Sequence, residues 1–186
     1  MDSTRRYWLS NCLGIAALAE VASAHEHART ASLSTTPPRF EILDPAVAVE
    51  IEAIAAQIIP STDGPGAREA GVIFFIDRAL STFDSDKREI YRLGMLEVQE
   101  RRKELFPDSA SLASLPNQQQ IALVRVIEDS RFFDLLRVHT VLAFLGDPSY
   151  GGNRERIGWK HIGFDDRMSF QPPFGYYDAQ SQGSGE

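Results

Sequence analysis

Apolar residues recur at intervals of three and four between residues 44 and 145, and this periodicity constrains the fold more than any other feature. Such spacing places apolar side chains on one face of a helix. In the first segment the periodic positions are Val47, Ile51, Ile54 and Ile58. Asp44 and Pro45 suit the N-cap and the first position of this helix, and Pro60 ends it. The pattern predicts an all-α chain.

Four further helices are expected after the first. The second carries Ile73, Ile76, Leu80 and Phe83 on its apolar face. The third starts at Asp84 or Ser85, which can cap it, ends near Leu105, and turns Tyr91, Met95 and Val98 inward. The fourth opens at Pro116 and carries Ile121, Val124 and Ile127. The fifth, from Phe132 to Leu145, is apolar on nearly every side, so it is either the central helix of a small bundle of about five helices or a surface for a partner.

The first 24 residues have the layout of a twin-arginine export signal. Arg5 and Arg6 precede a mildly apolar stretch, and Ala22-Ser23-Ala24 forms a small-residue cleavage site. The apolar stretch is too short to span a bilayer as a transmembrane anchor. The alternative is a short amphipathic helix that stays on the protein, since Glu20 interrupts the apolar run. The prediction is export of an already folded chain to the periplasm through the twin-arginine translocase.

The rest of the chain divides into three parts. Residues 25–41 carry almost no periodic apolar signal and are predicted to be a flexible linker. Residues 42–146 are predicted to form the helical domain. Residues 147–186 form a C-terminal tail rich in aromatic residues, Gly and Pro, without periodicity and therefore irregular. The tail's aromatic side chains should be buried, either against the chain's own bundle or in a groove of a partner.

Charge and cysteine content exclude several classes of function. The chain has a formal net charge of −7 and no stripe of Lys and Arg, which argues against binding to nucleic acid or to anionic lipid. Protein partners or neutral small molecules fit better. The single cysteine, Cys12, lies in the expected signal. The mature chain therefore cannot supply a disulfide, a thiolate zinc site or a cysteine-ligated iron–sulfur cluster by itself.

No motif in the sequence indicates chemistry of its own. No G-x-G-x-x-G follows a predicted strand, so neither flavin nor nicotinamide binding is supported. His139 lies in the middle of the apolar fifth helix, on the face that carries Leu135 and Leu142, where a hydrogen-bonded core histidine is favoured over a haem or metal ligand. We therefore assign no catalytic, cofactor-binding or metal-binding residue.

Three groups of residues resemble the gluconate 2-dehydrogenase subunit 3 family over about residues 42–164. The first is Ile58-Ile59-Pro60-Ser61-Thr62-Asp63-Gly64-Pro65-Gly66-Ala67 with Ala70-Gly71-Val72. The second is Phe132-Phe133 with Leu136, and the third is Tyr150-Gly151-Gly152-Asn153 with Gly158-Trp159-Lys160. After Gly163 the chain has Phe164-Asp165-Asp166, where an aromatic residue followed by Pro-Gly is expected. That departure affects how the tail docks and leaves the resemblance standing.

The resemblance implies a small, helical, noncatalytic subunit of a periplasmic or membrane-associated dehydrogenase that oxidises a sugar, a sugar acid or an alcohol. In this family the small subunit carries the export signal, a large partner subunit holds the FAD, and a cytochrome c subunit commonly accepts the electrons. The small subunit is expected to escort and stabilise the flavoprotein. Candidate partner-interface residues are Pro60, Tyr150, Gly151, Gly152, Asn153, Trp159, Phe164, Phe174, Tyr176 and Tyr177.

Two other classes of function stay open at this point. The first is a free-standing periplasmic small-molecule-binding protein whose aromatic tail lines a pocket, which requires Trp159 and Tyr150 to face inward on a cavity. The second is a metal- or haem-dependent enzyme, which requires His139 to reach open space.

Overall fold

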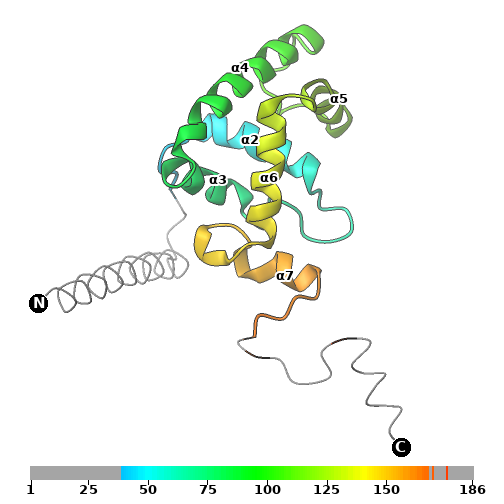
Figure 1. The fold of residues 1–186 in the computed structure, drawn as a ribbon. Helices are drawn as coiled ribbons and strands as arrows, with labels where there is room; N and C mark the ends of the chain where they lie inside the picture. Colours follow the sequence, from blue (N-terminus) through cyan, green and yellow to red (C-terminus); the bar gives the residue numbers. More distant parts are fainter. Residues whose placement is uncertain (1–38, 168, 170–174, 176–186) are drawn as a thin grey trace, which may run out of the picture.

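The computed structural model describes residues 39–167, 169 and 175, and this part of the chain is helical (Figure 1). The α-helices are α2 (Pro45–Ile58), α3 (Val72–Ser81), α4 (Arg88–Leu105), α5 (Asn117–Ile127), α6 (Arg131–Leu145) and α7 (Ile157–His161). Short 3₁₀ turns occur at η1 (Ser85–Lys87), η2 (Pro148–Tyr150) and η3 (Arg154–Arg156). No strand is found among the described residues, which confirms the all-α prediction.

Helix α6 is the central helix of the bundle. It packs against α2, α3 and α4, and α7 lies against it near its C-terminal end (Figure 1). Its inward face is built from Phe132, Leu136, Ala143 and Phe144, all buried. Ile51 and Ile54 of α2 are completely buried in the same core, as the periodicity of the first segment predicts. The sequence-based prediction of a central fifth helix is therefore confirmed.

Local sequence explains where the helices begin. The Asp44 carboxylate accepts a hydrogen bond of 2.8 Å from the backbone N–H of Ala46, and Pro45 occupies the first position of α2, both as predicted. The Ser130 hydroxyl caps α6 by accepting from the N–H of Phe133 at 3.1 Å. Neither Asp84 nor Ser85 caps α4, contrary to prediction, because α4 starts at Arg88 after η1. The Asp84 carboxylate binds Lys87 and His139 instead.

Three predicted positions differ in burial from the expectation. Phe83 is 57% exposed, since α3 ends at Ser81 and the helical spacing no longer holds two residues later. In α5 Leu123 and Ile127 are fully buried, whereas Ile121 is only half-buried. His139 lies on the buried face with Leu136 rather than with Leu142, which is exposed.

Gly94 in the middle of α4 has a packing role. A Cβ at this position would lie 2.1 Å from Cγ of Phe132, closer than any real contact allows. Glycine therefore lets α4 approach α6 around the Phe132 ring, and the close approach outweighs the low helix propensity of glycine.

The segment after α6 is less irregular than predicted. Its described residues include η2, η3 and α7, and Gly158 and Trp159 are buried against the bundle. At the other end, the chain already packs on the bundle at Phe40, whose ring stacks on Phe74 with centroids 5.3 Å apart. None of the helices in the described ranges is long and apolar enough to cross a membrane.

Candidate functional site

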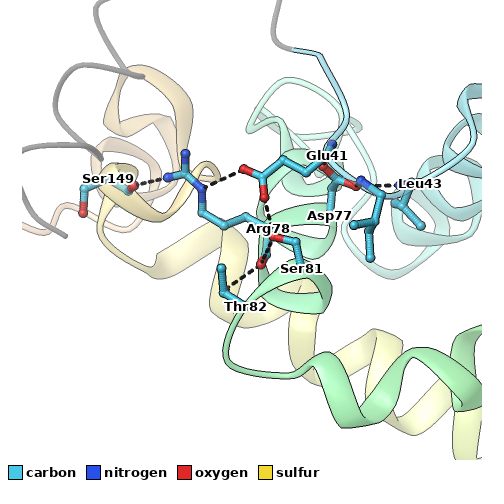
Figure 2. A network of polar contacts seen from close by, with 8 residues as sticks. Glu41, Leu43, Asp77, Arg78, Ser81, Thr82 and Ser149 are labelled. Carbon is cyan, nitrogen blue, oxygen red and sulfur yellow. Dashed lines mark hydrogen bonds and ion pairs between the residues drawn. The ribbon is translucent and has the colours of Figure 1, made fainter.

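Asp77 of α3 fixes the segment that enters the bundle. Its carboxylate accepts hydrogen bonds from three consecutive backbone N–H groups, those of Glu41 (2.5 Å), Ile42 (3.1 Å) and Leu43 (2.8 Å). Figure 2 shows the carboxylate pointing from α3 toward this segment. A carboxylate with several backbone donors is a strong, directional anchor. Asp77 thus determines where the N-terminal segment joins the fold.

Arg78, the next residue, links the N-terminal segment of the described chain to the turn after α6. Its guanidinium donates to the backbone carbonyl of Ser149 at 2.7 Å and lies 3.8 Å from the carboxylate of Glu41 (Figure 2). Glu41 also accepts a hydrogen bond from the Ser81 hydroxyl. The N-terminal segment and the turn after α6 therefore meet on α3.

A second polar cluster lies inside the bundle and is centred on His139. The Nε2 of His139 lies 2.9 Å from the Asp84 carboxylate, and its Nδ1 lies 2.9 Å from the Tyr91 hydroxyl. Burial lowers the pKa of His139, although the hydrogen bond to Asp84 opposes the shift. Burial also raises the pKa of Tyr91. His139 is 1% exposed, so the prediction of a hydrogen-bonded core histidine is confirmed.

For Asp84 itself, two effects oppose each other. Desolvation raises the pKa of the carboxyl, but hydrogen bonds from Lys87 and His139 outweigh it and leave the pKa below its ordinary value. The carboxylate is therefore charged when the cluster is formed.

The loop Gly151-Gly152-Asn153 is packed tightly against the bundle. Gly151 has a φ of +105°, a conformation that favours glycine. A Cβ on Gly152 would lie 2.3 Å from the carbonyl oxygen of Ala143 in α6. Asn153 is fully buried; its side chain donates to the carbonyl of Gly146 and accepts from the N–H of Gly158, both at 2.8 Å. These side-chain bonds hold the chain in place between α6 and α7.

Trp159 follows the same pattern. Its indole Nε1 donates to the carbonyl of Leu145 at 2.6 Å, and the residue is 9% exposed. Gly152, Asn153 and Trp159, expected as candidates for a partner interface, are thus buried within this chain and do not form an exposed surface. Of the two alternatives for the tail, packing on the chain's own bundle holds for these three residues.

Other interface candidates are accessible. Tyr150 and Phe164 are about half exposed, at 49% and 50%, and Pro60 is exposed in the turn between α2 and α3. Gly151 is partly buried. Arg5, Arg6, Phe174, Tyr176 and Tyr177 lie outside the described residues.

Three segments that are distant in the sequence meet at one end of the bundle. A Cβ on Gly64 would lie 2.5 Å from Cε1 of His161, so the turn after α2 packs on α7. The backbone N–H of Arg154 donates to the carbonyl of Ala70 at 3.0 Å. The guanidinium of Arg154 also lies 4.6 Å from the ring centroid of Phe74. The turn after α2, the start of α3 and the segment after α6 therefore form one end of the bundle.

Sequence reasoning missed Asp77 and Arg78, and it gave Asp84 only the role of a possible helix cap. For Asp77 a signal exists, because it stands four residues after Ile73 and shares the buried face of α3. A carboxylate on an apolar helical face requires a partner when buried. Its actual partners, backbone groups more than thirty residues earlier, carry no side-chain signature.

Within residues 39–167, 169 and 175, no three His, Cys, Asp or Glu side chains gather as a metal ion would require. The buried ionisable groups there serve other contacts. Glu50, for example, accepts from the backbone N–H of Leu112 at 3.0 Å, and burial raises its pKa above the ordinary 4.5.

Comparison with known proteins gives one match. The family model described as gluconate 2-dehydrogenase subunit 3 matches residues 48–166, more than half of the chain. A search of curated proteins found no match, and a search of solved structures found none. The matched range runs from α2 to the residues just after α7.

Proposed function

Because this chain belongs to the gluconate 2-dehydrogenase subunit 3 family, and is therefore a small subunit of a dehydrogenase complex, we propose that it acts without catalysis of its own. In this proposal its large partner subunit holds FAD and oxidises a sugar, a sugar acid or an alcohol. The small subunit stabilises that flavoprotein and escorts it through twin-arginine export to the periplasm. A cytochrome c subunit that accepts the electrons fits the same scheme.

The single observation that carries the proposal is the extent of the family match. It includes the bundle and the end of the molecule where the turn after α2 packs on α7. The buried polar groups are consistent with a structural role. Both ring nitrogens of His139 are engaged by Asp84 and Tyr91, so an enzyme that uses His139 on a substrate is not favoured.

The free-standing binding protein is also less well supported. That function requires Trp159 and Tyr150 to face a shared cavity, but Trp159 packs on the end of α6 through its bond to Leu145. Tyr150 has a half-exposed ring. The two rings therefore do not behave as paired walls of a ligand pocket.

The experiment that tests the proposal is affinity purification of the tagged chain from its native envelope fraction. Partners are identified by mass spectrometry, and an absorbance scan between about 350 and 550 nm detects the flavin of the partner. A large flavoprotein recovered in equal amount supports the proposal. A lone, colourless and stable monomer refutes it.

The escort role has its own test, replacement of Arg5 and Arg6 by Lys. Export of the large subunit should fall together with export of this chain, because the signal on the small subunit serves both. If the large subunit reaches the periplasm normally in the absence of this chain, the escort role is wrong.

A further inference from the structure

The solvent-facing side of α6 carries a row of large apolar side chains. Val138, Val141, Leu142 and Leu145 follow at intervals of three, one and three, which is one face of a helix. They are between 38% and 52% exposed, and no Asp, Glu, Lys or Arg interrupts the segment 138–146. We call these four residues the α6 stripe.

A further exposed apolar ring, that of Phe164, lies close to the end of α6 through its contact with Trp159. Leu145 at the C-terminal end of the stripe is bonded through its carbonyl to the indole of Trp159. The ring of Phe164 meets Trp159 edge-on at a centroid distance of 5.2 Å, and Phe164 is half exposed. The buried Trp159 ring thus links the exposed Phe164 ring to the C-terminal end of the stripe.

Charged groups border this surface at both ends. The ion pair between Asp134 and Arg137, with 3.3 Å between its atoms, stands just before Val138 on α6. The guanidinium of Arg156 lies 5.8 Å from the ring centroid of Trp159 at the other end. An apolar centre with a charged rim is the usual composition of a protein–protein interface.

Elsewhere, α4 carries the exposed apolar residues Leu93, Leu96 and Leu105, and α2 and α5 carry one each. Val49 is the one large apolar residue exposed on α2, and Val126 is the one exposed on α5. Single residues of this kind are normal on protein surfaces, whereas contiguous ones mark interaction sites. Val49 and Val126 therefore serve as matched controls.

We propose that the α6 stripe, with Phe164, is the surface on which the large dehydrogenase subunit docks. The inference rests on the proposed function and adds where the partner binds. Leu142 is the anchor of this surface, because it is the most exposed residue of the stripe. Burial of its side chain against an apolar surface of the large subunit would remove it from water.

Among residues 39–167, 169 and 175, none covers the stripe. Beyond Phe164, the described residue Ser169 is exposed. A second copy of the chain is a poorer occupant than the large subunit, because two chains that each carry a net charge of −7 repel one another. The family adds the reason to choose the large subunit, since its members are small subunits of a larger dehydrogenase.

The test is co-expression of the full chain with the large subunit, followed by purification through a tag on this chain. The variants are Val138→Glu and Leu142→Glu in the stripe, with Val49→Glu and Val126→Glu as controls at equally exposed apolar positions. A carboxylate in the centre of an apolar interface should reduce recovery of the large subunit at least about tenfold. The controls should recover it as the unchanged chain does. Circular dichroism melting of each variant verifies that the bundle is folded.

Each outcome separates the inference from the proposed function. If folded stripe variants retain the large subunit as well as the controls do, the docking surface is wrong and the proposed function stands. If the unchanged chain recovers no large subunit, both are overturned. Sedimentation of the purified chain gives a third result: self-association that Leu142→Glu abolishes, with binding of the large subunit intact, assigns the stripe to a second copy and overturns the inference.

Discussion

The Nε2 atom of His139 in α6 lies 2.9 Å from Oδ2 of Asp84, the residue that precedes η1. Because a carboxylate only accepts hydrogen bonds, Nε2 carries the proton of the neutral ring, and this N–H donates a hydrogen bond to Asp84. Nδ1 is then an acceptor, and the Tyr91 hydroxyl of α4 donates to it. One neutral tautomer therefore satisfies all three side chains and joins α4 and α6 to the turn before η1.

Tyr91→Phe tests this chain of hydrogen bonds. The substitution keeps the buried ring and removes the donor, so Nδ1 of His139 is left without a partner inside the bundle. We expect a loss of about 1–3 kcal/mol in the free energy of unfolding, measured by urea denaturation. Tyr150→Phe is the matched control because the Tyr150 ring is half exposed, and it should change stability by less than about 0.5 kcal/mol. Equal effects of the two variants would refute the arrangement.

The stability of the bundle should decrease as pH falls below about 6.5, the ordinary pKa of histidine. Burial lowers the pKa of His139 in the folded state, so in this range the unfolded state binds the proton more readily. The contribution of His139 to the free energy of unfolding is complete above its unfolded-state pKa and is lost as pH falls through its folded-state pKa. One proton changes the free energy of unfolding by at most about 1.4 kcal/mol per pH unit. The measurement is urea unfolding at several pH values.

Two carboxyl groups, those of Glu50 and Asp84, also change the stability with pH, so the experiment needs a control variant that keeps both. Burial raises the pKa of Glu50 from 4.5, so its contribution has the opposite sign and stability increases as pH falls through its folded-state pKa. The pKa of Asp84 is lowered, and its contribution is lost only at pH values below the ordinary 3.8. His139→Gln retains Glu50 and removes the imidazole. A pH dependence between 7 and 5 that is the same in His139→Gln and in the unchanged chain would contradict the prediction.

Helices with a one-sided apolar pattern could be predicted from the sequence, and residues with distant backbone partners could not. Helix α2 follows from its periodicity and its Asp44-Pro45 start, because both are local. The burial of Leu123 in place of Ile121 depends on how α5 is rotated against α2 and α4, which spacing alone leaves open. The apolar character of α6 predicted its central position but not which of its sides remains exposed.

The segment after α6 shows the same limit. The Gly, Asn and aromatic residues of this segment led to the prediction of an irregular chain. The helices there are only three to five residues long, and helices this short show no apolar periodicity that a sequence could reveal. The buried position of Asn153 depends on the carbonyl of Gly146 and the N–H of Gly158, two backbone groups that have no signature in side-chain sequence. The partners of Asp77 are likewise backbone N–H groups, which the sequence does not reveal.

Gly94→Ala should destabilise the bundle, although alanine normally stabilises the interior of a helix by about 1 kcal/mol relative to glycine. The new Cβ would lie 2.1 Å from Cγ of Phe132, and overpacking of this kind costs about 1–3 kcal/mol. Glu100→Ala, at an exposed position of α4, is the control. In the double variant Gly94→Ala with Phe132→Leu, the smaller side chain should make the combined loss less than additive. A stabilising Gly94→Ala would show that the two helices are not in this contact.

Removal of the Asp77 carboxylate should loosen the segment that enters the bundle. In Asp77→Ala the N–H groups of Glu41, Ile42 and Leu43 lose their acceptor, and we expect a loss of about 2–4 kcal/mol in the free energy of unfolding. Asp77→Asn keeps one carbonyl acceptor and should lose less. Trypsin should cut after Arg39 faster in Asp77→Ala than in Asp134→Ala, whose exposed ion pair contributes under about 1 kcal/mol. Because local release of the segment differs from global unfolding, cleavage at Arg39 that is equally slow in both variants would show that the carboxylate does not anchor it.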